Sequence, residues 1–270
     1  MARGESGWLL DEFPYVRLGD GSRPLVVLPG ATDPLFDGNY PRLAVHLLGR
    51  YYHRFTDDYT VYVISRPRGL EAGKTIRDMA DDYARVLEEE IGTAAVWGLS
   101  MGGCIAQQLA VEHPTLVDEL VLGVTGTRIA EGARERVDEM RRRAYDHDWQ
   151  AIRAAIAAGM FSDWRRMVYP SMTASVGRFT LPTPAVPSDA WISIEALLDY
   201  DGRRSVGGIR APTLVIGGEN DPFFPPAILE ETAEAIPDAE LHVIQGARHG
   251  AFHTHKPTFE RRILAFLDGR

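Results

Sequence analysis

Short apolar stretches alternate with longer amphipathic ones along most of the chain, and this alternation limits the folds open to it. Residues 25–28 are apolar throughout and stop at Pro29-Gly30, as expected of a strand buried on both faces. Residues 76–91 carry apolar side chains at spacings of three and four with acidic residues between them, which predicts an amphipathic helix. Strands that alternate with helices predict an α/β fold with a mostly parallel sheet covered on both faces.

The same patterns place the remaining elements and reveal one interruption. Further strands are expected at residues 15–18, 60–64, 94–97, 119–124, 213–216 and 241–244, and further helices at 40–55, 104–112, 226–235 and 257–267. Residues 127–205 contain no convincing strand; helices are expected there at 131–145, 149–160 and 191–200. We therefore predict a core domain of residues 1–126 and 206–270 and a helical cap of residues 127–205.

The cap has two interpretations. It could serve only as a packing layer, or it could cover a site as a lid. Open α/β sheets bind ligands at the carboxyl ends of their strands, where an insertion between two strands would lie. This placement favours the lid.

Composition and charge exclude several classes of protein. The chain has 270 residues, of which 45% are hydrophobic and 25% charged, and no apolar run approaches the roughly 20 residues of a membrane helix. The net charge of −9 argues against nucleic acid or an anionic membrane as the main partner. Residues 1–11 lack a signal-peptide layout, so a cytoplasmic location is expected. The single cysteine, Cys104, allows no disulfide within the chain, and a homodimer is left open.

One motif carries chemistry. Gly98-Leu99-Ser100-Met101-Gly102 has the form G-x-S-x-G and lies between a predicted strand and a predicted helix. Glycines at these positions permit a sharp turn in which Ser100 takes a strained backbone conformation and presents its hydroxyl above the sheet. The alternative is an ordinary turn with Ser100 as the helix N-cap.

A serine nucleophile needs a base, and the base needs an orienting acid. Asp221 follows the strand at 213–216 and is the predicted acid, with Glu219 as its rival and a turn role before Pro222 as the alternative. His249 follows the strand at 241–244 and is the predicted base. His253 and His255 lie close behind it, but the order Ser, Asp, His explains His249 better than a metal site would.

The predicted oxyanion hole consists of two backbone N–H groups. One belongs to Met101, directly after the nucleophile, and the other to Ala31, in the loop after the strand at 25–28. The alternative is that Pro29-Gly30 forms only a turn. Cys104 lies four residues beyond Ser100 and is interpreted as packing rather than as a nucleophile.

These residues together resemble the α/β-hydrolase fold family over most of the chain. The resemblance rests on the 28–30 loop, the 98–103 turn, the strand at 211–216, Asp221 and the segment 246–249. It is greatest to the branch with esterases and enol-lactonases such as 3-oxoadipate enol-lactonase, in which the inserted helices form a cap that shapes the pocket. Two departures concern the pocket: Pro29 stands where the branch usually has His, and residues 65–70 lack its usual Asp and second Gly.

The sequence therefore predicts a serine hydrolase that cleaves a small or medium carboxylic ester or lactone through an acyl-enzyme, with no cofactor and no metal. C–C bond hydrolysis, cofactor-free perhydrolysis and non-catalytic binding of a small ligand remain alternatives. Arg165 and Arg166 could pair with a substrate carboxylate, although a solvated helix face explains them more simply. Cap residues that could line an apolar pocket are Trp149, Met160, Phe161, Trp164, Met167, Tyr169 and Trp191.

Overall fold

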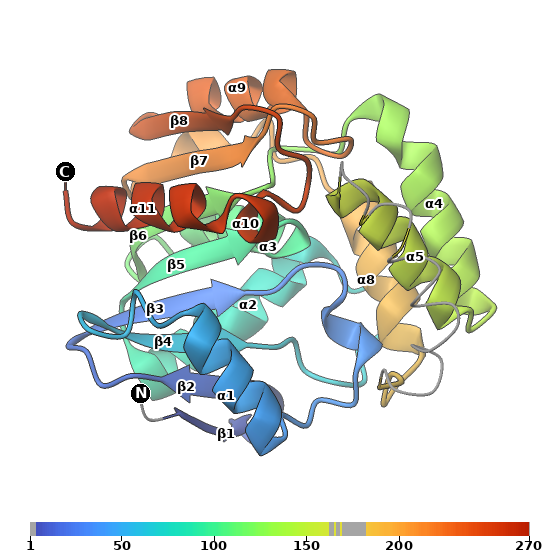
Figure 1. Cartoon of the computed structure of the whole chain (residues 1–270), viewed down its shortest axis with the longest axis horizontal. Helices are drawn as coiled ribbons and strands as arrows, with labels where there is room; N and C mark the ends of the chain where they lie inside the picture. Colours follow the sequence, from blue (N-terminus) through green and yellow to red (C-terminus); the bar gives the residue numbers. More distant parts are fainter. Residues whose placement is uncertain (1–3, 162–164, 166–167, 169–181, 270) are drawn as a thin grey trace.

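An eight-stranded sheet forms the centre of the computed structural model, which describes residues 4–161, 165, 168 and 182–269 (Figure 1). The strand order is β1-β2-β4-β3-β5-β6-β7-β8. Strands β1 and β2 pair antiparallel, β2 joins β4 antiparallel, and all other pairs are parallel. The strands are β1 (Gly4–Leu9), β2 (Phe13–Leu18), β3 (Arg23–Leu28), β4 (Tyr59–Ile64), β5 (Ala94–Leu99), β6 (Val117–Gly123), β7 (Thr213–Gly218) and β8 (Ala239–Ile244).

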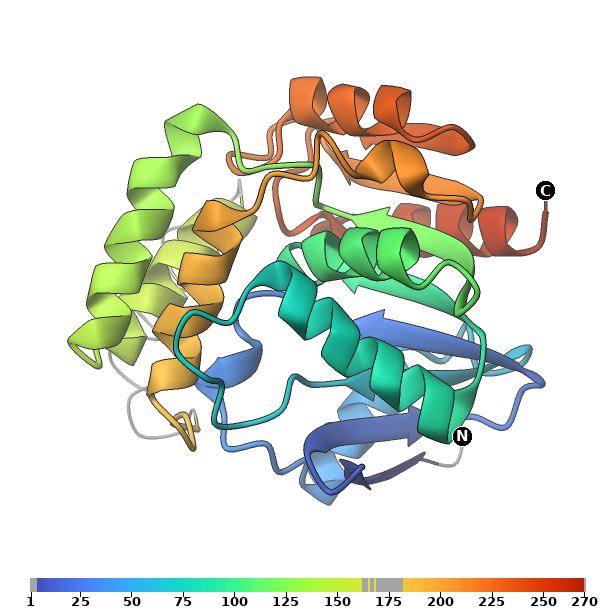
Figure 2. The same ribbon diagram turned by 180° about the vertical axis from the view of Figure 1, so that it is seen from behind.

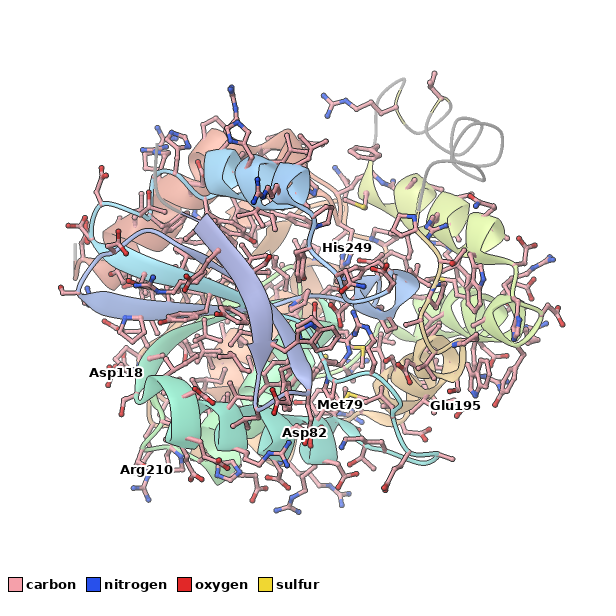
Figure 3. All side chains as sticks on the ribbon, turned by 90° about the horizontal axis from the view of Figure 1, so that it is seen from below. Met79, Asp82, Asp118, Glu195, Arg210 and His249 are labelled. Atoms are coloured by element: carbon pink, nitrogen blue, oxygen red, sulfur yellow. The ribbon has the colours of Figure 1, made fainter. Side chains whose placement is uncertain are left out.

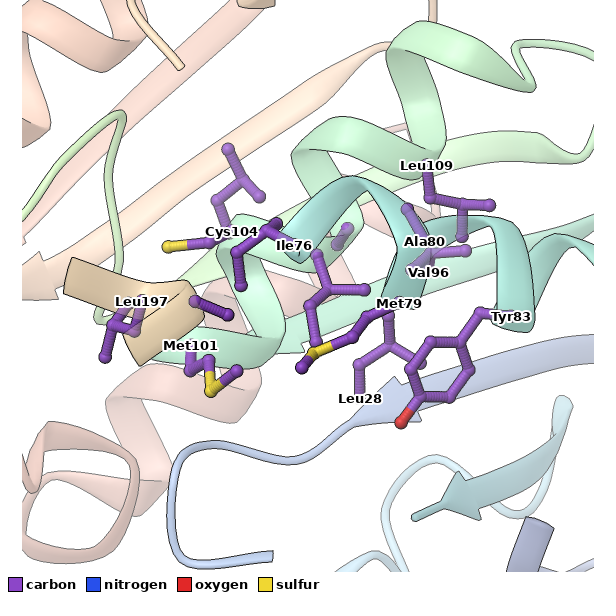
Figure 4. Close-up of a cluster of buried hydrophobic side chains, with 14 of the residues drawn as sticks. Leu28, Ile76, Met79, Ala80, Tyr83, Val96, Met101, Cys104, Leu109 and Leu197 are labelled. Carbon is purple, nitrogen blue, oxygen red and sulfur yellow. The ribbon is translucent and has the colours of Figure 1, made fainter. Parts of the chain in front are cut away.

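Helices cover both faces of the sheet (Figures 1 and 2). On one face lie α2 (Ile76–Val86), α3 (Met101–Glu112) and α9 (Pro226–Ala235); on the other lie α1 (Arg42–Tyr51) and α11 (Lys256–Leu267). Figure 4 shows the hydrophobic core on the face covered by α2, α3 and α9, where apolar side chains of α2 and α3 pack on those of β3 and β5. The predicted α/β architecture is therefore confirmed.

The segment between β6 and β7 forms a helical layer beside the carboxyl ends of the parallel strands (Figure 1). Its described helices are α4 (Glu131–Tyr145), α5 (Trp149–Met160) and α8 (Ser188–Asp199), and α4 packs against both of the others. None of the described helices in the chain is long and apolar enough to cross a membrane.

Some elements differ from their predicted form. The edge strand β1 was not predicted because its sequence, GESGWL, lacks an alternating apolar pattern; it is defined by its pairing with β2. The helix predicted over residues 76–91 is α-helical only to Val86 and ends in a π-helical turn, η2 (Leu87–Ile91). A short 3₁₀ turn, η1 (Asp33–Leu35), and a short helix, α10 (Ala251–Thr254), were also missed.

We expect that replacing Gly102 by alanine destabilises the fold by about 3 kcal/mol or more. A Cβ atom there would overlap the carbonyl oxygen of Leu28 and lie 2.7 Å from that of Pro29, and neither backbone atom can move aside as a side chain would. Denaturant unfolding measures the change. The matched control is Gly132→Ala at an exposed position of helix α4, where a Cβ atom meets nothing within 4 Å. Equal stability of the two variants would contradict the predicted close contact.

Candidate active site

Ser100 occupies the sharp turn between strand β5 and helix α3. Its backbone has φ 54° and ψ −121°, a conformation that costs a residue with a side chain about 1–3 kcal/mol. The turn is held because the Ser100 amide donates to the carbonyl oxygen of Gly123, at 2.9 Å. Ser100 holds the N-cap position of helix α3, but its hydroxyl makes no capping bond and its backbone is strained, so the interpretation of an ordinary capping turn is wrong.

The hydroxyl of Ser100 instead meets His249, in the loop after strand β8. Nε2 of His249 lies 3.0 Å from Ser100 Oγ, and Nδ1 lies 2.8 Å from Oδ2 of Asp221. The imidazole is buried between two aromatic rings: Phe223 meets it edge to face, and Phe224 lies nearly parallel to it. These contacts fix the ring so that one nitrogen faces the serine and the other faces the carboxylate.

Asp221, in the loop after strand β7, is 3% exposed and has partners on both oxygens. Oδ1 accepts hydrogen bonds from the amides of Phe223 and Phe224, at 2.8 and 3.1 Å, and Oδ2 faces the imidazole. As a carboxylate, Asp221 can only accept, so Nδ1 of His249 carries the proton and Nε2 is free to accept the serine proton.

The rival acid, Glu219, lies elsewhere. It is exposed and accepts a hydrogen bond from the amide of Gly246, at 2.8 Å, so it anchors the loop that leads to His249. The structure thus brings Ser100, Asp221 and His249 together and leaves Glu219 outside the group.

Both residues predicted for the oxyanion hole lie beside Ser100. Met101 opens helix α3, and the first amides of a helix have no carbonyl partner within it. The loop with Gly30 and Ala31 passes close by: a Cβ atom built on Gly30 would be 3.3 Å from Cβ of Ser100. Their role as donors to an oxyanion stays a prediction.

A cavity of about 550 Å³ is lined by Ser100, His249 and residues of both the core and the cap helices. Figure 3 shows the labelled His249 on the side of the core that faces these helices. The walls of the cavity are mainly apolar. Cap and adjoining residues on the wall are Ile129, Val137, Met140, Ile156, Met160, Ile194, Leu197 and Phe223; core residues include Phe36, Tyr40, Leu47, Leu48, Tyr51, Leu99 and Phe252. No lysine or arginine is found among the described residues that line it.

Only part of the predicted cap lining is in place. Met160 lines the cavity, whereas Trp149 and Trp191 stack on His147 within the cap. Phe161 and Arg165 lie against each other, the guanidinium carbon 5.6 Å from the ring centre, and neither is on the described cavity wall. Trp164, Arg166, Met167 and Tyr169 lie outside the described residues.

The other candidate residues have separate environments. His253 lines the cavity, and its pKa is lowered to about 4, first by desolvation and then by nearby Lys256. His255 is the N-cap residue of α11, with Nδ1 2.9 Å from Thr254 Oγ1. Among the described residues, no three His, Cys, Asp or Glu side chains are grouped as metal ligands would be. Burial raises the pKa of Cys104 to about 12, so its thiol is not an activated nucleophile.

The sequence analysis did not identify a buried charged side chain that contacts the loop beside Ser100. Arg66, two residues after β4, is fully buried against the loop of residues 29–30 and against Asp33. The sequence pointed to this segment only as a departure from the usual pattern. An arginine two residues after a strand gives no signal of what it will contact.

Residues 25–260 match the model of a family described as the "Alpha/beta hydrolase family". The match spans most of the chain, which therefore belongs to the alpha/beta hydrolase family. The resemblance stated from the motifs is confirmed, and with it the prediction of a hydrolase at the level of family.

The individual relatives have low sequence identity to this chain. The chain is 27% identical to a pimeloyl-[acyl-carrier protein] methyl ester esterase of Chromobacterium violaceum over 244 residues, 87% of this chain and 91% of that protein. It is 32% identical over 186 residues to the polyketide synthase ThaQ of Burkholderia thailandensis, but the match spans only 9% of that protein and 66% of this chain. The crystal structure of the enol-lactonase from Burkholderia xenovorans has a TM-score of 0.76 at 22% identity, covering 98% of this chain and all of that one. This last likeness concerns the fold.

Proposed function

We propose that the chain is a serine hydrolase that cleaves small or medium carboxylic esters or lactones with an uncharged, apolar acyl part. The observation that carries the proposal is the unbroken hydrogen-bond chain from Ser100 through His249 to Asp221, at the wall of an apolar cavity. A serine, a base that can take its proton and a carboxylate that holds the base are the parts acyl transfer requires.

The proposed reaction has two steps. Ser100 Oγ attacks the substrate carbonyl carbon as His249 Nε2 takes its proton, and Asp221 stabilises the imidazolium that forms. The N–H groups of Ala31 and Met101 bind the negative charge on the former carbonyl oxygen. His249 then protonates the leaving alcohol, and water activated by the same histidine releases the acid.

The class of bond is supported by the relatives. The Chromobacterium violaceum protein is named as a methyl ester esterase and aligns over most of both chains. This relative favours ester hydrolysis over C–C bond cleavage or perhydrolysis.

The character of the acyl part follows from the cavity wall. A substrate carboxylate that entered the cavity would lose its hydration and meet no cation among the described lining residues. An alkyl chain, in contrast, would be buried against leucine, isoleucine, methionine and phenylalanine side chains. The cavity wall therefore disfavours an enol-lactone that carries a carboxylate as the substrate.

A panel of p-nitrophenyl esters tests the proposal. We expect kcat/KM to rise about fourfold for each methylene added to a short acyl chain, because a buried methylene contributes about 0.8 kcal/mol. The matched comparison is an ester of equal length that ends in a carboxylate, which we expect to react at least about tenfold more slowly. A preference for the carboxylate ester would contradict the proposed substrate class, and no turnover of any ester would contradict the proposed activity.

A further inference from the structure

We propose that Arg66 is a positioning residue: its buried guanidinium holds the loop of residues 29–31 so that the Ala31 N–H faces the reacting carbonyl. The proposal rests on the function proposed above, since it concerns the oxyanion hole of that reaction. Arg66 touches no substrate and acts through the loop.

The guanidinium of Arg66 makes two hydrogen bonds to this loop. Nη1 of Arg66 donates to the carbonyl oxygen of Pro29, at 3.1 Å, and Nη2 donates to that of Gly30, at 3.0 Å. The Gly30 oxygen also accepts a hydrogen bond from the amide of Asp33, at 3.1 Å. Two donors therefore fix one carbonyl group in direction.

Fixing that carbonyl fixes the amide of the next residue. The peptide between Gly30 and Ala31 is planar and trans, so its C=O and N–H groups point in opposite directions. The C=O points toward Arg66, so the N–H of Ala31 points away from it. Gly30, Ala31 and Ser100 line the cavity and Arg66 does not, so this direction leads to the cavity side.

The guanidinium is itself held by a buried carboxylate. Asp33 Oδ2 accepts a hydrogen bond from the backbone amide of Arg66, at 3.0 Å, and lies 3.7 Å from Nη2. Arg66 is 1% exposed, and a charge buried to this extent is stable only when paired. Arg68 shares the same carboxylate and holds it in place, since its Nη1 donates to Asp33 Oδ2, at 3.3 Å, and to the carbonyl oxygen of Arg66.

The same network reaches the cap. Asp189 on helix α8 accepts hydrogen bonds from the amides of Gly69 and Leu70, at 2.9 and 2.7 Å, directly after Arg68. Cap helix α8 and the loop of residues 29–31 are thus joined through the short segment of residues 66–70.

The two hydrogen bonds to the loop require an arginine rather than a lysine at position 66. The planar fork of a guanidinium can donate to two carbonyl oxygens at once, whereas a lysine ammonium is a point charge on a flexible stem. A lysine at position 66 would retain the charge beside Asp33 but lose the simultaneous hold on Pro29 and Gly30.

Arg66→Met and Arg66→Lys test the role, with exposed Arg210→Met as the matched control. The measurements are kcat and KM on the best ester, the inhibition constant of a trifluoromethyl ketone, which forms an oxyanion on Ser100, and the thermal midpoint. We expect kcat to fall about 10²-fold, as when one oxyanion donor is lost, with KM changed by less than about threefold. Affinity for the ketone should fall in parallel with kcat, and Arg66→Lys should not restore it.

A third variant, Arg66→Ala, is assayed with and without free guanidinium at concentrations far below those that unfold proteins. Partial recovery of kcat by guanidinium, but not by ammonium, is expected. Wild-type kcat and ketone affinity in correctly folded Arg66→Met would overturn the proposal, as would a loss of kcat in all three variants that only follows the unfolded fraction. An inactive wild-type enzyme would instead contradict the proposed function.

Discussion

We expect Ser100→Ala to lower kcat for the best ester by about 10⁶-fold. The serine and the histidine act as one unit, so the loss of either removes nearly all the acceleration that the group provides. The hydroxyl is the hydrogen-bond partner of His249 Nε2, at 3.0 Å, and alanine leaves nothing to receive the acyl group. Single-turnover kinetics with the purified variant measures the loss of catalytic rate without interference from slow product release.

The control for this substitution is a comparison of its free energy of unfolding with that of Ser100→Gly. The strained backbone at residue 100, with φ 54°, remains in Ser100→Ala but is relieved in Ser100→Gly. We expect Ser100→Gly to be inactive as well, yet more stable than Ser100→Ala by about 1 kcal/mol in urea unfolding. A variant that keeps more than a small fraction of wild-type kcat would show that another group is the nucleophile.

Asp221→Asn should lower kcat by about 10⁴-fold with little change in KM. An asparagine amide that keeps the two bonds from Phe223 and Phe224 on its oxygen presents its NH₂ group to His249 Nδ1. The imidazole then carries its proton on Nε2, so it cannot accept the proton of Ser100. Steady-state kinetics on the same ester gives the two constants.

Glu219→Gln is the matched control for that variant. It removes one negative charge two residues away, but Glu219 contacts the amide of Gly246 rather than the imidazole. We expect its kcat to stay within about twofold of wild type, since an exposed carboxylate contributes little. A large loss in Glu219→Gln together with a mild one in Asp221→Asn would assign the acid to Glu219.

The sheet and its covering helices could be predicted because each element carries its own local pattern. Helices α4, α5 and α9 begin and end where the sequence placed them, since charged or alanine-rich stretches and Pro226 mark their limits. Strand β1 could not be found in this way, because it is stabilised by pairing with β2 rather than by an apolar face of its own.

The site shows the same division. Ser100, Asp221 and His249 follow three different strands, and the rule that the carboxyl ends of parallel strands meet was enough to place them together. Arg66, Asp33 and the aromatic pair Phe223–Phe224 could not be predicted, because their partners are set by the packing of loops. The same holds for the cavity wall: of the four suggested cap residues that the structure describes, Met160 lines the cavity and Trp149, Phe161 and Trp191 do not.

The central claim is that Ser100 is an activated nucleophile, and labelling with a fluorophosphonate probe tests it most directly. The probe reacts with an activated serine and requires no knowledge of the substrate. We expect mass spectrometry to find one phosphonyl adduct, on the peptide that contains Ser100, and to find none in folded His249→Ala. A folded wild-type protein that stays unlabelled, or an adduct on another residue, would contradict the claim.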